Sequence, residues 1–293
     1  MRILILGGSG MLGHQLFRSL SERHRVRVTL QHRLADYPFP GLFCEENTYQ
    51  SIDLRKEDAI RRVFAEFRPE AVINGAGVIK QRDAAKAAIP CIEINALLPH
   101  RLSWLCQDSG ARLVQPSTDC VFSGKGGKYR ESDFPDADDL YGRSKLLGEV
   151  NEKHCITLRT SIIGLELANK QSLIEWFLAQ KGRIQGYRNA IYSGFTTLEM
   201  ARIVEKVLIE YPALSGVYQV ASEPIDKYTL LKKLCAKLQR RDLEIDPDEQ
   251  FVCDRSLNGE RFASATGYRA PDWERMLDEL AAQIQARERI SNQ

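Results

Sequence analysis

Ile3-Leu-Ile-Leu6-Gly7-Gly-Ser-Gly10-Met-Leu-Gly13 stands at the start of the chain and decides its fold. The apolar run that begins it predicts a buried strand, and residues 11–21 have the apolar spacing of a helix. Glycines between a strand and a helix permit a tight turn, and they let a diphosphate approach the free N–H groups at the helix N-terminus. The spacing G-x-x-G-x-x-G at this place therefore favours a dinucleotide-binding loop over a plain strand-to-helix turn. The residues that we expect to line this loop are Gly7, Gly10, Met11, Leu12 and Gly13.

Short apolar runs continue to alternate with segments of helical period as far as about residue 165. This alternation is typical of an α/β fold in which crossover helices join parallel strands, so we predict a Rossmann-type doubly wound parallel sheet. The expected strands after the first are residues 26–30, 71–74, 111–115 and 155–159, and the expected helices are 59–67, 92–107 and 140–152. The run 33–51 is long for a structureless loop, and it has room for a short strand that the pattern does not locate.

Beyond residue 165 the alternation loosens, and only one further strand is predicted, at residues 217–221. The pattern there predicts a smaller C-terminal region of helices at 172–180, 198–210, 228–239 and 273–287. We therefore expect residues 1–165 to form an NAD(P)-binding Rossmann domain and residues 166–293 a substrate-binding region. No linker separates the two parts, so the boundary is soft and the parts interleave.

Composition narrows the function classes. The 293 residues are 43% apolar and 27% charged, which is ordinary for a soluble globular protein, and the net charge of +2 gives no reason to expect a nucleic-acid partner. The seven cysteines are scattered without a C-x-x-C pair, so neither a disulfide framework nor a metal site is expected. The first apolar run is too short for a signal peptide, and no apolar run approaches 18 residues. We expect a cytoplasmic protein with no membrane partner.

Tyr141 and Lys145 are four residues apart on a predicted helix, so they share one face. The lysine charge would lower the pKa of the tyrosine from its usual value near 10, which would make Tyr141 a proton donor near neutral pH. Thr118 follows the predicted strand 111–115, and strand ends are where open parallel sheets bind ligands. Its hydroxyl would donate to a substrate carbonyl oxygen that Tyr141 protonates, while Lys145 holds the nicotinamide ribose. Together with the glycine loop, these residues predict a nicotinamide-dependent reductase.

The second predicted strand is followed by Leu30-Gln-His-Arg33, without the acid that commonly binds the ribose hydroxyls of NAD. Because Arg33 is available for a 2′-phosphate, NADPH is the favoured cofactor, with NADH possible; the alternative is that Arg33 is a solvated loop residue. Asp53 and Leu54 precede a predicted helix. Asp53 either contacts the adenine or serves only as the N-cap of that helix.

Several motifs in the first half of the chain resemble those of one protein family. Ser117-Thr-Asp-Cys-Val-Phe-Ser-Gly124 is similar to its S-T-D-Y-V-F-x-G, and Tyr141-Gly-Arg-Ser-Lys-Leu-Leu-Gly-Glu149 matches its Y-G-x-S-K-x-x-G-E. Further similar segments are Val72-Ile-Asn-Gly-Ala-Gly77, Ile94-Asn95-Ala96, Tyr129-x-Glu131-x-Asp133 and Leu158-Arg-Thr-Ser161. The chain thus resembles the extended short-chain dehydrogenases/reductases and, among them, the dTDP-4-dehydrorhamnose reductase family.

The resemblance implies a role for particular residues. It implies Thr118, Tyr141 and Lys145 as the catalytic triad and Asp119 as a residue that approaches the sugar. It also places along the cofactor the residues Gly75, Ala76 and Gly77. Arg255, in a faint echo of the family's late R-P-x-x-S-x-L stretch, is a candidate to meet the substrate. The implied reaction is reduction of a nucleotide-linked 4-keto-6-deoxy sugar by NADPH, in the synthesis of surface polysaccharide sugars.

Some positions and functions stay open at this stage. Cys120 and Ile162 replace an aromatic residue of the family near the sugar, and Cys120 is expected to be a packing residue and not a nucleophile. Asn95 either positions groups near the active site or satisfies buried backbone, and His14 is expected at the surface. The rival functions are an epimerase or dehydratase that retains NAD, and a non-catalytic NADP-binding regulatory subunit, because the beta subunit of methionine adenosyltransferase resembles the same family. A homodimer is equally open.

Overall fold

Seven parallel strands form the central sheet of the computed structural model, which describes residues 1–37, 41–79, 87–168 and 170–291. Their order is β10-β6-β5-β4-β1-β2-β3. The bounds are β1 (Arg2–Leu6), β2 (Arg25–Thr29), β3 (Thr48–Tyr49), β4 (Ala71–Asn74), β5 (Arg112–Thr118), β6 (Cys155–Thr160) and β10 (Gly216–Gln219). Strand order reverses beside β1, and a crevice at such a point is where doubly wound sheets bind ligands.

Helices cover both faces of this sheet, which explains why its strands are continuous apolar runs. Ile3 and Ile5 pack in one core, and Leu4 and Leu6 pack in a second core on the other face. All four side chains are fully buried, and each such burial stabilises the fold by about 1.5–3 kcal/mol. The first face carries α1 (Met11–Leu20) and α7 (Thr197–Ile209), and the second carries α2 (Glu57–Phe67), α4 (Leu98–Ser109) and α5 (Leu140–Leu147).

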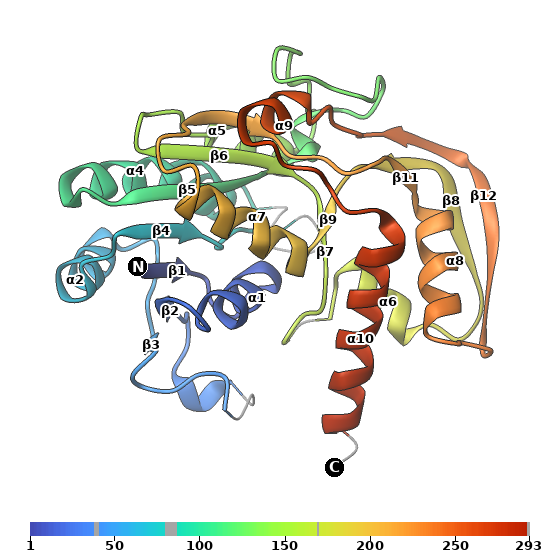
Figure 1. Cartoon of the computed structure of the whole chain (residues 1–293), viewed down its shortest axis with the longest axis horizontal. Coiled ribbons are helices and arrows are strands. Elements are labelled where there is room, and N and C mark those ends of the chain that lie inside the picture. Colours follow the sequence, from blue (N-terminus) through green and yellow to red (C-terminus); the bar gives the residue numbers. More distant parts are fainter. Residues whose placement is uncertain (38–40, 80–86, 169, 292–293) are drawn as a thin grey trace.

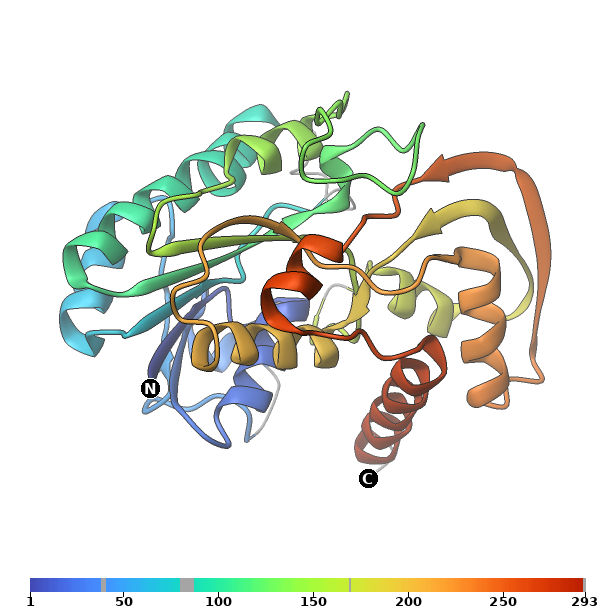
Figure 2. The ribbon, with the colours of Figure 1, turned by 45° about the horizontal axis from the view of Figure 1, so that its top comes forward.

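A second, three-stranded sheet stands at the end of the molecule opposite α2 and α4 (Figures 1 and 2). Its order is β11-β8-β12, and a separate pair joins β7 and β9. The elements of this part are β7 (Ile162–Ile163), α6 (Leu173–Ala179), β8 (Gly182–Tyr192), β9 (Phe195–Thr196), β11 (Ile225–Asp226), α8 (Lys227–Lys237), β12 (Leu243–Asp254), α9 (Glu260–Thr266) and α10 (Trp273–Ser291). The chain returns to the large sheet at α7 and β10, so the two parts interleave.

The predicted α/β fold with a Rossmann-type parallel sheet is confirmed. The expected helix 92–107 is the π-helix η3 (Ile92–Leu97) followed by α4, and a short helix that was not predicted, α3 (Ala88–Cys91), precedes them. The short strand that the sequence did not locate is β3, which follows the 3₁₀ turn η1 (Leu34–Asp36). The long strands β8 and β12 were not predicted at all.

The expected helix 140–152 is too long, since α5 ends at Leu147. Gly148 lies against the η3 backbone, where an added Cβ would stand 1.9 Å from the carbonyl oxygen of Asn95. This close approach turns the chain out of the helix and sends Glu149 into the interior. In the described part of the chain, no helix is both long enough and apolar enough to cross a membrane.

Candidate active site

The glycine loop between β1 and α1 forms a cradle that only glycines fit. Gly7 has a φ of +74°, and a Cβ on Gly13 would stand 2.2 Å from the carbonyl oxygen of Gly7. A Cβ on Gly8 would stand 2.5 Å from the side chain of Val28 in β2. Gly10 caps α1 without a side-chain hydrogen bond, and helix geometry leaves the first amides of α1 free of acceptors within the helix. This arrangement fits the diphosphate of a dinucleotide, as the sequence predicted.

His14 supports this loop from inside, so its expected place at the surface is wrong. The side chain is 4% exposed, and its Nδ1 lies 2.9 Å from the carbonyl oxygen of Gly10. Burial lowers the pKa of His14 to about 4, so the ring is neutral and Nδ1 is the donor to that carbonyl. His14 therefore fixes the residue at which α1 begins.

The loop after β4 forms the next wall of the cradle. A Cβ on Gly7 would meet the backbone of Ala76 at 3.0 Å, so Gly75, Ala76 and Gly77 lie beside the glycine loop. Asn95 holds this loop from η3: its Oδ1 accepts from Val78 N at 2.8 Å, and its Nδ2 donates to the Val78 carbonyl at 3.0 Å.

Asn95 also reaches the helix that carries Tyr141. Its Nδ2 lies 3.2 Å from the hydroxyl of Ser144, and the Asn95 side chain is buried. Asn95 therefore satisfies buried backbone, and in doing so it links the loop after β4 to α5. The π-helix that places it is a local departure of the kind found at functional sites.

Thr118 ends β5 and caps the short 3₁₀ turn η4 (Asp119–Val121). Its Oγ1 accepts from Cys120 N at 3.1 Å and donates to Asp119 Oδ1 at 3.2 Å. The first turn of α5 lies directly on η4, since a Cβ on Gly142 would stand 2.2 Å from the Cys120 carbonyl oxygen. This contact brings the first turn of α5, which carries Tyr141, to the residues that follow Thr118.

The side chain of Lys145 completes the set from the next turn of α5. Its Nζ donates to the carbonyl oxygen of Pro116 at 2.8 Å, and only 8% of the residue is exposed. Burial lowers the pKa of Lys145 to about 8, against the opposing negative charge of Glu149. The structure therefore brings Thr118, Tyr141 and Lys145 together at the carboxyl end of the sheet.

The predicted lowering of the Tyr141 pKa by Lys145 is wrong for this structure. Burial raises the pKa of Tyr141, nearby acidic groups raise it further, and the hydrogen bond with Thr118 opposes the rise. Helical spacing showed that the two side chains share a face, but it could not show how deeply that face is buried. Tyr141 is consequently neutral near pH 7, and its role as the proton donor stays a prediction.

The C-terminal region brings Arg255 to this edge, directly after β12. The Arg255 guanidinium donates from Nε to the Phe122 carbonyl at 2.9 Å, and its Nη1 lies 3.7 Å from the thiol of Cys120. Burial raises the pKa of Asp119, and the charge of Arg255 opposes that rise. Burial also raises the pKa of the Cys120 thiol to about 12, which is unlike a nucleophilic cysteine. Asp119 and Arg255 thus lie beside the catalytic set.

The residues expected around the adenosine lie on the other side of the cradle, near β2 and α2. The Arg33 side chain is 78% exposed, with a loose ion pair to Asp36 at 3.9 Å. Asp36 is a nearby carboxylate that sequence reasoning missed, because the search for an acid stopped at Arg33. Leu54 packs partly buried against the second core.

Asp53 is not the N-cap of α2, which is Lys56. Its carboxylate accepts from the Arg55 guanidinium, with both distances 2.9 Å, and this hydrogen bonding lowers the pKa of Asp53. Contact with the adenine stays a prediction.

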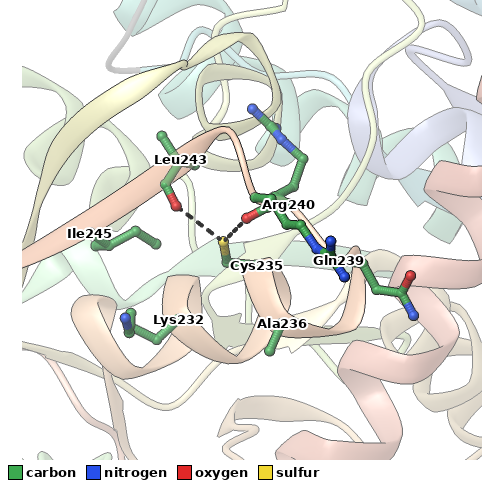
Figure 3. A pocket seen from close by; sticks show the side chains of 8 residues that line it. Lys232, Cys235, Ala236, Gln239, Arg240, Leu243 and Ile245 are labelled. Atoms are coloured by element: carbon green, nitrogen blue, oxygen red, sulfur yellow. Dashed lines mark hydrogen bonds between the residues drawn. The ribbon is translucent and has the colours of Figure 1, made fainter.

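A separate pocket lies between α8 and β12, lined by Lys232, Cys235, Ala236, Gln239, Arg240, Arg241, Leu243 and Ile245 (Figure 3). The Cys235 thiol donates to the carbonyls of Arg240 and Leu243 at 3.5 and 3.9 Å. The pocket contains none of the site residues named above. Among the described residues, no group of three or more His, Cys, Asp or Glu side chains could hold a metal ion.

The doubly wound parallel sheet is the fold of solved nucleotide-sugar enzymes, among them a dTDP-4-dehydrorhamnose reductase from Clostridium acetobutylicum (TM-score 0.78, 22% identity, 97% of this chain and 100% of that one) and a UDP-glucose 4-epimerase from Thermus thermophilus (TM-score 0.77, 19% identity, 97% and 99%). The chain belongs to the RmlD substrate binding domain family, whose model matches residues 1–181.

Comparison with individual proteins agrees with this assignment. The chain is 23% identical to a dTDP-4-dehydrorhamnose reductase from Aggregatibacter actinomycetemcomitans, over 96% of this chain and 98% of that protein. It is 28% identical to methionine adenosyltransferase 2 subunit beta from Danio rerio, over 53% of this chain and 44% of that protein. The solved dTDP-4-dehydrorhamnose reductase from Bacillus anthracis in complex with NADP has the same fold, with a TM-score of 0.77, 23% identity and coverage of 96% of this chain and 99% of that one.

Proposed function

We propose that the chain is a cytoplasmic NADPH-dependent reductase of a nucleotide-linked 4-keto-6-deoxy sugar, with a place in the synthesis of surface polysaccharide sugars. The observation that carries this proposal is the meeting of Thr118, Tyr141 and Lys145 beside the glycine cradle. The relative from Aggregatibacter, which this chain matches over nearly its whole length, supports the substrate class through its name.

The residues of the chain have distinct parts in the proposed reaction. NADPH, when bound in the cradle, supplies a hydride to the ketone carbon. Thr118, whose hydroxyl hydrogen points to Asp119 Oδ1 in the free protein, turns it to the ketone oxygen when substrate binds and so stabilises the negative charge that develops there. Tyr141, which is neutral because its pKa is raised, gives its proton to the same oxygen. Lys145, one helical turn beyond Tyr141, would hold the nicotinamide ribose, as the family resemblance implies.

We further propose that residues 166–293 act as the substrate-binding region and residues 1–165 as the cofactor domain. Arg255 arrives from the C-terminal region, whereas Asp119 belongs to the Rossmann part, so a substrate between them would contact both. With Cys120 and Ile162 in place of the family's aromatic residues, the sugar pocket has a different lining, which favours testing several keto-sugars.

Turnover with a panel of substrates tests the proposal. Purified protein is mixed with NADPH or NADH and with the dTDP-, UDP- and GDP-linked 4-keto-6-deoxy sugars, and cofactor absorbance is followed. A stoichiometric loss of NADPH absorbance with one of the sugars is expected. An epimerase or dehydratase would instead retain tightly bound NAD through purification and show no net cofactor consumption.

One observation favours a second candidate, a non-catalytic regulatory subunit: the chain is similar to methionine adenosyltransferase 2 subunit beta over about half its length. Against it, the Thr-Tyr-Lys set is complete and assembled. Binding of NADPH without turnover of any sugar in the panel would support this candidate over the reductase.

The reductase should lose activity as pH rises through about 8. Lys145 has a pKa lowered to about 8 by burial, so its ammonium is present below that pH and is lost above it. We expect kcat/KM for the sugar to fall roughly tenfold per pH unit above this point. A profile of kcat/KM between pH 6 and 10 measures this alkaline limb, and the activity regained after return to pH 7 shows that the enzyme stayed folded. A limb near the ordinary lysine value would contradict the role of buried Lys145.

Arg33→Ala should reduce the preference for NADPH. The exposed Arg33 side chain can form a charge-assisted hydrogen bond with the 2′-phosphate, and its loss should raise the Kd for NADPH roughly tenfold while leaving the Kd for NADH unchanged. Fluorescence titration with both cofactors measures the ratio. Arg183→Ala, at an equally exposed arginine of the second sheet, is the control that should change neither. An unchanged ratio in Arg33→Ala would show that Arg33 is a solvated loop residue.

A further inference from the structure

A buried ion pair joins the segment after α5 to strand β6. Glu149 and Arg159 have side chains that are 7% and 6% exposed. The guanidinium donates from Nε to Oε1 at 2.8 Å and from Nη2 to Oε2 at 2.7 Å, which is the two-pronged geometry of a strong charge-assisted pair. Gly148 makes this possible, because the turn there sends Glu149 inward.

The same carboxylate also holds the end of β5. Ser117 Oγ donates to Glu149 Oε1 at 2.7 Å, and Ser117 is the register neighbour of Arg159 in the sheet. Ser117 stands between Pro116, whose carbonyl accepts from Lys145, and Thr118, which faces Tyr141. The Glu149 carboxylate therefore fixes the part of β5 that holds both Lys145, through the Pro116 carbonyl, and Thr118.

Stability alone does not explain such a group. Well-packed apolar residues commonly replace a buried ion pair without loss of stability, since desolvation of the two charges offsets most of their attraction. An apolar pair cannot form hydrogen bonds that fix the positions of its neighbours. Here Ser117 of β5 donates one hydrogen bond and Arg159 of β6 donates two to the Glu149 carboxylate, which lies just after α5.

We propose that Glu149, held by Arg159 and Ser117, is a positioning residue that sets the place and charge of the catalytic pair Thr118 and Lys145. The inference rests on the proposed reductase function. Glu149 fixes the strand from which Thr118 meets the ketone oxygen, and its negative charge, four residues from Lys145, favours the lysine ammonium.

The other groups around Lys145 do not duplicate this charge. Its own helix contributes Tyr141, which is neutral. The η4 turn contributes Asp119 and Cys120, whose pKa values burial raises toward the neutral form. The η3 helix presents the uncharged Asn95 to α5 and carries the partly exposed Glu93. Strand β6 contributes Arg159, a cation.

Glu149→Gln is the first test, because it keeps the shape and an acceptor for Ser117 but removes the charge. We expect kcat to fall about 10- to 100-fold with the KM for NADPH within about twofold, since small misplacements at a reacting centre have effects of this size. The alkaline limb of the pH profile should move to lower pH, because burial then acts on Lys145 without an opposing carboxylate.

The matched control is Glu199→Gln. Glu199 is an equally buried glutamate on α7, bound by an arginine and a hydroxyl as Glu149 is: Arg202 at 2.8 Å and Tyr268 at 2.8 Å. Its variant should lose less thermal stability, because Arg202 is 39% exposed and keeps Glu279 as a partner, and it should leave kcat and the pH limb unchanged. If both variants changed the pH profile alike, or if Glu149→Gln kept wild-type kcat and limb, the positioning role would be overturned.

A readout without turnover separates this inference from the reductase proposal. The ¹³Cε resonance of labelled Lys145, identified by its loss in Lys145→Met, reports the lysine titration directly. In Glu149→Gln its midpoint should move to lower pH, and an unmoved midpoint would overturn the charge role even if no substrate is found. If Glu149→Gln does not fold, the double variant Glu149→Leu/Arg159→Met removes both charges; it should fold and still show the loss of kcat, and wild-type kcat in it would contradict the proposal.

Discussion

Tyr141→Phe should lower kcat by roughly 10³-fold while leaving NADPH binding nearly intact. The hydroxyl is the only part removed, so the ring still fills its place on α5, and the cofactor cradle is untouched. Tyr141 supplies the proton in the proposed reaction, and its neutral state suits that role. Single-wavelength assays of cofactor absorbance and fluorescence titration of NADPH measure the two quantities.

The size of this effect separates catalysis from packing. A 10³-fold loss corresponds to about 4 kcal/mol of transition-state stabilisation, whereas the net contribution of an ordinary hydrogen bond to stability is about 1 kcal/mol. Tyr187→Phe, a partly exposed phenol that packs on Phe251 in the second sheet, is the control and should keep full activity. Wild-type turnover by Tyr141→Phe would remove Tyr141 from the mechanism.

The large sheet, and the edge at which its strands end, could be predicted because the interactions that determine them join residues close together in the sequence. Residues 3–6 are apolar on both faces of the strand since helices cover both sides, and the glycines beyond them are required by close backbone contacts within a few residues. The same holds for Thr118 at the end of β5. Such features are visible in the order of residue types alone.

The second sheet could not be predicted, because its strands lack that signal. The strand β12 is at an edge, carries Pro247 and several acidic residues, and has a bulge between Asp248 and Val252. Edge strands tolerate proline and polar residues on both faces, so the sequence resembles a loop. The partner β8 is likewise exposed over much of its length, and only their long parallel pairing, across about 60 residues, makes either a strand.

Site features that depend on burial also could not be predicted from the sequence. His14 follows the glycine loop on a helix that a hydrophobic pattern cannot orient at its first turn, and only packing showed that it lies under Gly10. The direction of the Tyr141 pKa shift was wrong for the same reason. The role of Glu149 required three elements, β5, β6 and the turn at Gly148, that meet only in the folded chain.

Gly13→Ala should raise the Kd for NADPH about 100-fold, which corresponds to roughly 3 kcal/mol. Helix propensity alone predicts the opposite direction of effect on α1, since alanine is favoured over glycine inside a helix by about 1 kcal/mol. The contact decides otherwise: the new Cβ would stand 2.2 Å from the carbonyl oxygen of Gly7, and no side-chain rotation relieves a clash with backbone. The loop must move away from α1, and the amides that would hold the diphosphate move with it.

A graded series shows whether this contact is the cause. At Gly10 the added Cβ would stand 3.3 Å from the same oxygen, so Gly10→Ala should weaken NADPH binding less than Gly13→Ala does. At Gly126, outside the cradle, the nearest atom to the added Cβ is 3.6 Å away, and Gly126→Ala should bind NADPH as the wild type does. Fluorescence titration gives the three Kd values, and thermal unfolding shows whether each variant is folded at the assay temperature. Because the order follows from distances to one carbonyl oxygen, a folded Gly13→Ala protein with wild-type affinity would show that the diphosphate is not bound at this loop.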